Sequence, residues 1–124
     1  MGSCGGAKVW YIPDCFYPEK SSGLFPSHEA ICVLNPGKTD ANIEITLYFE
    51  DREKVDGFKI VCEAERTKHV RMDKLVNDKG QSVPKGVSYA AMVRSDVDII
   101  VQYSRMDTTQ AEMALMTTMA YPLT

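Results

Sequence analysis

The sequence has no long apolar run, no C-x-x-C pair and only two histidines among its 124 residues. No segment approaches the ~20 apolar residues that a membrane-spanning helix needs. The N-terminus lacks the apolar stretch of a signal peptide, so we expect a cytoplasmic protein. Four cysteines without metal-ligand spacing argue against a zinc site, and reduced thiols are expected rather than disulfides. We therefore expect neither a metal nor a cofactor.

Signature motifs of common enzyme classes are also missing. The sequence contains no G-x-S-x-G, no P-loop, no H-E-x-x-H and no G-x-G-x-x-G. The formal net charge is −3, with 14 Lys and Arg against 17 Asp and Glu, and the pI is near 5.3. An acidic balance argues against a dedicated nucleic-acid binder, although the basic patch over 66–74 keeps that alternative open. We expect a chain that is not an enzyme.

What is present is typical of one globular domain. Hydrophobic residues make up 44% and charged residues 25% of the chain. A chain of 13.9 kDa buries about two-thirds of its ~20,000 Å² on folding, which is enough for one core. The expected organisation is a single domain over 1–124, with residues 1–8 as candidates for disorder.

Short strands separated by turn signals dominate the pattern. Ile43, Ile45, Leu47 and Phe49 alternate with polar residues, which predicts an antiparallel strand with one face in the core. Further strands are predicted over 7–13 (closed by Pro13-Asp14), 28–35, 58–64, 66–72 and from about 114. A loop is expected over 14–27, a charged turn over 51–57, a helical turn over 74–77 and another over 107–112. The fold class is all-β, a small antiparallel β-sandwich of about eight strands with little helix.

Two apolar features bear on packing. Residues 87–95 and 97–106 flank Ser95-Asp96 and predict a hairpin. The run from Ala30 to Leu34 is apolar on both faces, as in a strand inside a sandwich or under an oligomer partner. Cys32 and Cys62 are predicted to point inward and to be inert. The methionines of the C-terminal region are expected in the core or an interface rather than at a soft-metal site: Met106, Met113, Met116 and Met119.

The segment Arg66-Thr67-Lys68-His69-Val70-Arg71 is the most unusual one. On a strand, Thr67, His69 and Arg71 point one way and Lys68 and Val70 the other. One interpretation is a basic stripe that holds a carboxylate, a phosphate or sugar hydroxyls. The alternative is a solvated edge face.

Two other polar groups are candidates for a site. His28 and Glu29 directly precede the apolar run. One interpretation of the two residues is an acid/base pair, and the alternative is a pair of polar residues at the end of a strand. A polar corner follows the strongest apolar segment and is made of Gln102, Ser104, Arg105, Asp107 and Gln110. One interpretation is that these residues line the mouth of a pocket, and the alternative is that Arg105 and Asp107 form a local salt bridge. Four aromatic residues suit either a surface on which a sugar ring stacks or the hydrophobic core: Trp10, Tyr11, Phe16 and Tyr17.

Three stretches together resemble the Anabaena sensory rhodopsin transducer family. They are SHEAICVLNPGKTDANIEITLYFED, ERTKHVRMDKL and VQYSRMDTTQAEMALMTTMAY, in the same order along nearly the whole chain. The resemblance implies an antiparallel β-sandwich, a homotetramer, a cytoplasmic location and, as in the namesake, contact with a membrane photoreceptor. It also implies a small-molecule, carbohydrate-related binding role. The polar positions that match the family pattern are His28, Glu29, Arg66, Thr67, Lys68, His69, Arg71, Gln102, Arg105, Asp107, Gln110 and Glu112.

The leading hypothesis is a non-enzymatic domain that binds a small polar ligand or transduces a signal as a homo-oligomer. Its predicted ligand-binding residues are His28, Glu29, Arg66, Lys68, His69, Arg71, Gln102, Arg105, Asp107 and Gln110. One alternative is a protein-interaction module that docks on a membrane receptor, which predicts an exposed apolar patch instead of a pocket. Another is a sugar-processing enzyme that uses His28 and His69 as acid and base.

Overall fold

Eight strands and one short 3-10 turn occur in the described part of the chain, and all of their strand pairs are antiparallel. A computed structural model describes residues 5–18, 27–107 and 114–124. The elements are β1 (Ala7–Phe16), β2 (His28–Asn35), β3 (Ala41–Phe49), β4 (Val55–Cys62), β5 (Arg66–Arg71), η1 (Met72–Lys74), β6 (Ser88–Asp107), β7 (Ala114–Met119) and β8 (Tyr121–Leu123). The all-β class predicted from the sequence is confirmed. No helix in the described ranges is long and apolar enough to cross a membrane.

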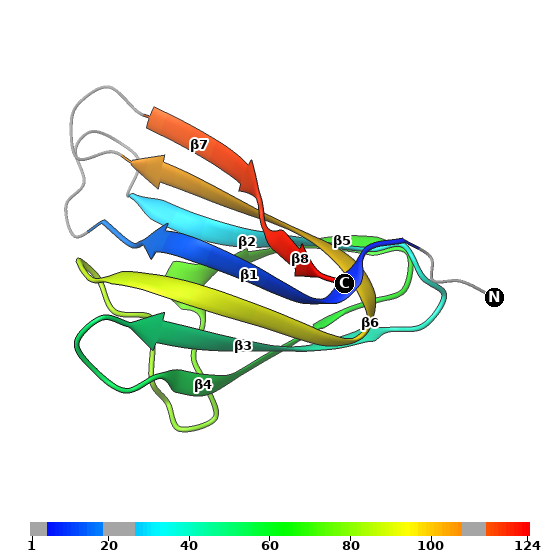
Figure 1. Cartoon of the computed structure of the whole chain (residues 1–124), viewed down its shortest axis with the longest axis horizontal. Coiled ribbons are helices and arrows are strands. Elements are labelled where there is room, and N and C mark those ends of the chain that lie inside the picture. Colours follow the sequence, from blue (N-terminus) through cyan, green and yellow to red (C-terminus); the bar gives the residue numbers. More distant parts are fainter. Residues whose placement is uncertain (1–4, 19–26, 108–113) are drawn as a thin grey trace.

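The strands form two sheets that share β6 (Figure 1). Sheet A has the order β4-β3-β6-β1-β8, and sheet B has the order β5-β2-β6-β7. The core lies between them and includes Ile45 and Phe58 from sheet A and Ile31 and Val101 from sheet B. We call the side where β6 bends the bend end, and the opposite side, where β1 ends and β2 begins, the loop end.

The predicted hairpin at Ser95-Asp96 is wrong, because residues 88–107 form one continuous strand of 20 residues. Its first arm pairs with β1 and β3, and its second arm pairs with β2 and β7. The chain therefore bends from one sheet into the other instead of reversing on itself. No glycine stands at the bend, and the Val97 amide donates to Ser95 Oγ at 3.2 Å. The Asp96 carboxylate accepts hydrogen bonds from the Asn42 amide and side chain at 2.9 and 2.8 Å.

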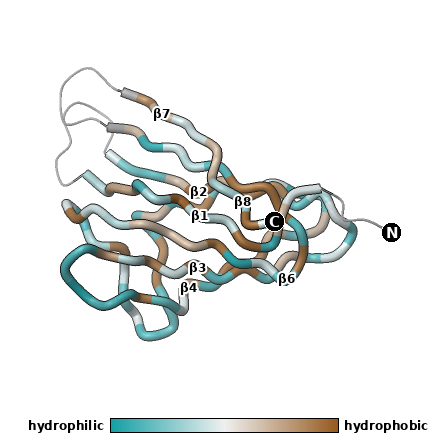
Figure 2. Tube along the Cα trace, viewed as in Figure 1, coloured by the Kyte–Doolittle hydropathy of each residue, from teal (hydrophilic) through white to brown (hydrophobic). Residues whose placement is uncertain are grey.

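The period-two pattern of β3 correctly predicts its core face. Ile43, Ile45 and Leu47 are buried and Asn42 is exposed. Figure 2 shows the contrast between the hydrophilic turn that joins β3 to β4 and the apolar stretches along the strands. The core therefore follows from alternation alone in this part of the chain.

Several strands and turns begin or end at other residues than predicted. The first strand continues beyond Pro13-Asp14 to Phe16, with an irregular register between Ile12 and Cys15 that absorbs the proline. β4 begins at Val55, inside the predicted turn, and ends at Cys62. The short helical turn lies at 72–74 rather than 74–77. The strand predicted from about 114 is confirmed as β7, while the turn predicted over 107–112 lies mostly outside the described residues.

The bend end is tied to β1 by tight contacts. The Trp10 indole N–H donates to the carbonyls of Ala7 and Ile99, each at 3.0 Å. Gly6 has φ +95°, and a Cβ there would lie 2.2 Å from the Ile99 carbonyl oxygen. Trp10 is therefore a core residue and not a sugar platform. Tyr17 is also buried, and of the aromatic residues proposed for a platform only Tyr11 is exposed.

Candidate functional site

The outer surface of sheet B gathers many of the predicted site residues on one side. In register, His69 and Gln102 flank Cys32, and Arg71 and Ser104 flank Ala30. Directly opposite residues in antiparallel strands share a face. We call this surface the sheet B face, and it is made of Thr67, His69, Arg71, His28, Ala30, Cys32, Leu34, Ile100, Gln102, Ser104, Met106, Leu115, Thr117 and Met119.

The sheet B face has apolar side chains open to solvent and a polar edge along β5. Leu34, Met119 and Leu115 are 42%, 57% and 72% exposed. The Arg71 guanidinium binds both oxygens of Asp73 at 2.8 Å, so this cation is already paired. A flat sheet surface that combines open apolar groups with a basic edge suits contact with another protein better than enclosure of a small molecule.

Cys32 is placed differently from the prediction. Ile31 and Val33 point into the core, so the alternation puts Cys32 on the sheet B face, where it is half-buried. Cys62 is buried as predicted, and Cys15, Cys32 and Cys62 are all free thiols. Of the methionines predicted to lie in the core or an interface, Met119 is not in the core, because it lies on the sheet B face.

Arg66 and Lys68 lie apart from His69 and Arg71. They are exposed at the start of β5, beside a shallow hollow of about 350 Å³ that Cys62 and Glu63 also line. The alternation predicted for this strand is confirmed, since Lys68 pairs opposite Val33 and His69 opposite Cys32. The predicted basic stripe is therefore divided between two faces of sheet B.

Glu29 and Arg105 lie opposite each other on the inner side of sheet B, at the loop end. Glu29 has no exposed surface. One of its carboxylate oxygens accepts a hydrogen bond from Tyr89 Oη and the other accepts one from Tyr103 Oη. The Phe16 amide in turn donates to Tyr103 Oη at 3.2 Å. A residue predicted to contact ligand is thus the centre of a buried hydrogen-bond cluster.

Burial controls the titration of this cluster. Burial raises the pKa of Glu29, and the hydroxyls of Tyr103 and Tyr89 and the charge of Arg105 oppose that shift only in part. Burial and the neighbouring Glu29 raise the pKa of both tyrosines. Burial also raises the pKa of the Cys15 thiol beside them. The tyrosine hydroxyls therefore stay protonated at neutral pH and remain hydrogen-bond donors.

The last two corner residues lie at the edge of the described residues or beyond it. Asp107 ends β6 opposite Ala114, and the predicted site residue Gln110, like Glu112, lies outside the described residues. Gln102 and Ser104 lie on the sheet B face, whereas Arg105 points inward. The eight predicted residues whose side chains the structure describes are therefore divided among the sheet B face, the start of β5 and the buried cluster.

The two histidines do not converge. His69 lies opposite Cys32 on the neighbouring strand, and His28 stands four residues earlier on β2. A strand rises about 3.4 Å per residue, so the two backbone positions are separated by roughly 14 Å along the sheet. That separation is too large for both imidazoles to act on one reacting atom. No metal-binding group of three or more His, Cys, Asp or Glu side chains occurs within the described ranges.

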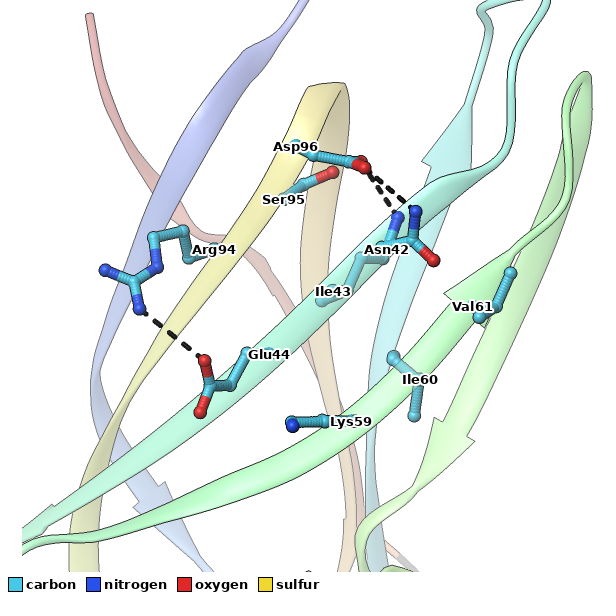
Figure 3. A pocket seen from close by; sticks show the side chains of 9 residues that line it. All are labelled: Asn42, Ile43, Glu44, Lys59, Ile60, Val61, Arg94, Ser95 and Asp96. Atoms are coloured by element: carbon cyan, nitrogen blue, oxygen red, sulfur yellow. Dashed lines mark hydrogen bonds and ion pairs between the residues drawn. The ribbon is translucent and has the colours of Figure 1, made fainter.

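A groove that sequence reasoning missed lies on sheet A (Figure 3). It has a volume of about 640 Å³ and spans β3, β4 and β6. Arg94, Glu44 and Lys59 form one cross-strand row in it, with Arg94 Nη2 at 3.5 Å from Glu44 Oε1. Glu44 also accepts a hydrogen bond from the Gly57 amide at 3.2 Å. The alternating polar residues of β3 were the only sequence signal for it.

Comparisons with known proteins agree with this architecture. A sequence model of the family described as Anabaena sensory rhodopsin transducer matches residues 5–122. The structure of Thermotoga maritima 1070 is similar at a TM-score of 0.85 and 34% identity, covering 95% of this chain and 96% of that one. The structure of the Anabaena sensory rhodopsin transducer is similar at a TM-score of 0.73 and 38% identity, covering 86% and 93%. No curated protein matches the chain. The chain therefore belongs to the Anabaena sensory rhodopsin transducer family of signalling domains.

Proposed function

We propose that this chain is a non-enzymatic, cytoplasmic signalling domain that acts as a homo-oligomer, a tetramer by the family resemblance, and associates through the sheet B face. The observation that carries the proposal is the set of open apolar side chains on this face, Leu34, Leu115 and Met119. Exposed apolar groups that gather on one sheet are typical of interaction surfaces. The self-association buries them and leaves the rest of the domain accessible to a signalling partner.

A membrane receptor is the partner that the family suggests for this oligomer. The related Anabaena protein is named as a transducer of a sensory rhodopsin, and it is 38% identical to this chain. The separation of His28 from His69 and the scatter of the basic residues support a role in contact rather than catalysis. The net charge of −3 supports a protein partner over nucleic acid.

Matched substitutions test the association surface. Leu34 on the sheet B face and Val61 on sheet A are similarly exposed, at 42% and 45%. Light scattering after size exclusion should give an oligomeric mass for the natural chain and for Val61→Glu. Leu34→Glu should reduce this mass, because a buried unpaired carboxylate opposes association. An oligomer that survives Leu34→Glu contradicts the assignment of this face, and a monomeric natural chain contradicts the oligomer itself.

A small polar ligand is a second candidate function, and the groove of Figure 3 favours it. Its row of Arg94, Glu44 and Lys59 carries one excess positive charge, while the Asp96 carboxylate that also lines the groove is bound by Asn42. Such a surface suits a sugar that carries an anionic group. Calorimetric titration with sugars and sugar phosphates should detect binding that Arg94→Ala weakens. An absence of heat at millimolar concentrations excludes this candidate.

A further inference from the structure

The Glu29 cluster joins the two sheets at the loop end. Tyr89 belongs to the first arm of β6, which pairs within sheet A, and Tyr103 belongs to the second arm, which pairs within sheet B. Glu29 accepts one hydrogen bond from each tyrosine, so a single carboxyl group bridges both arms. The Phe16 amide attaches the end of β1 to the same group through Tyr103.

We propose that Glu29 is a proton-controlled clamp that closes the loop end while it holds a proton and loosens that end when the proton is lost. The carboxyl group has no exposed surface, and an ionised carboxylate in that position forgoes hydration that it regains when the arms separate. The device goes beyond association through the sheet B face. It would make the spacing of the two sheets at the loop end depend on local pH.

The charged and titratable groups around Glu29 come from every neighbouring element. β1 contributes Asp14 and the Cys15 thiol, and the charges of Glu29 and Asp14 add to the burial that raises the pKa of this thiol. Arg105 on β6, with the two tyrosines, favours the charged form of Glu29. Beside β2, Arg71 and Asp73 bind each other at 2.8 Å, and His28 lies on the outer face. The charge of Arg105 therefore lowers the pKa of Glu29, but it does not outweigh burial.

The sign of the pH dependence follows from the direction of the pKa shift. Burial raises the pKa of Glu29 above the ordinary value of 4.5, so the closed state keeps a proton that the open state has already released. The contribution of the clamp is complete below the ordinary carboxyl pKa and is lost as the pH rises through the raised pKa. For one group, the opening equilibrium constant rises by at most about tenfold for each pH unit in this window.

Hydrogen exchange of the Phe16 amide measures the clamp directly, because that amide donates to Tyr103. We would record NMR protection factors on the full chain from pH 4.5 to 8, corrected for the intrinsic exchange rate. The Phe16 protection factor should fall by up to about tenfold per pH unit in the natural chain. It should stay level in Glu29→Gln, which keeps the shape of the side chain and removes its proton. The exposed Glu63→Gln is the matched control and should behave as the natural chain.

A second variant keeps the proposal testable if Glu29→Gln does not fold. Tyr89→Phe removes one hydroxyl that favours the charged carboxyl but leaves the Phe16–Tyr103 bond in place. Because the bridge between the arms is then broken, the Phe16 protection factor should be lower than in the natural chain at pH 4.5 and should fall less as the pH rises. A pH-independent Phe16 protection factor, the same fall in Glu29→Gln, or an equal fall at the Ala120 amide of the bend end would overturn the clamp.

Discussion

Removing either tyrosine hydroxyl should destabilise the fold, and the two losses should differ by a predictable amount. Tyr103 Oη donates to Glu29 and accepts from the Phe16 amide, whereas Tyr89 Oη donates to Glu29 and has the Cys15 thiol, a weak hydrogen-bonding group, as its other neighbour. Phenylalanine keeps the ring and its packing. At about 1.5 kcal/mol for each hydrogen bond lost in the interior, Tyr103→Phe should cost about 3 kcal/mol and Tyr89→Phe about half of that.

Urea denaturation at pH 7, followed by circular dichroism, measures both free energies of unfolding. A cost of about 3 kcal/mol is a large share of the 5–15 kcal/mol that typical domains have, so the difference is well within reach. The expected difference is contradicted if Tyr89→Phe is as destabilising as Tyr103→Phe, or if both changes cost less than about 0.5 kcal/mol. Either result would mean that the bonds to Glu29 and Phe16 contribute little net stability.

Three further changes test other parts of the fold. Gly6→Ala should lower the melting temperature and cost more than about 1 kcal/mol, because its φ is +95° and its Cβ would meet the Ile99 carbonyl; a neutral result contradicts the contact. Asn35→Ala should cost about 2–4 kcal/mol by urea denaturation, since the buried amide donates to the Cys62 carbonyl at 3.0 Å and makes two other bonds. In a monomeric variant, iodoacetamide should label Cys32 before Cys62, because burial raises the pKa of the Cys62 thiol; mass spectrometry of the peptides reports the order.

The local sequence pattern was sufficient to predict those strands whose ends and faces are determined by residues nearby in the sequence. β2 begins and ends at the predicted residues because Asn35, Pro36 and Gly37 form a turn, which the Asn35 side chain closes by accepting from the Gly37 amide at 3.1 Å. β3 was predictable because one of its faces is polar. By contrast, the run Ala30–Leu34 is apolar on both faces, so alternation gave no orientation and Cys32 was assigned to the wrong side.

Other features depend on contacts that no local pattern contains. Ser95-Asp96 looks like a turn, yet the bend of β6 is set by pairing to β1 and β2, which lie far away in sequence. Glu29 is charged and was expected to meet ligand, but its partners are 60 and 74 residues away. Charged residues are rarely buried without partners, and the tyrosines were not recognisable as those partners from the sequence.

The single strand β6 connects the Glu29 cluster to the sheet B face, because it carries residues of both. At the bend end the strand is fixed, because the Trp10 indole binds the Ile99 carbonyl and Gly6 packs against it. At the loop end the two arms are joined through Glu29, with Tyr89 on one arm and Tyr103 on the other. The proposed clamp predicts that opening this bridge changes the angle between the two arms at the bend. Because Gln102 and Ser104 lie on the second arm, we expect such a change to reorient the sheet B face relative to sheet A and so to link a buried proton to the proposed association surface.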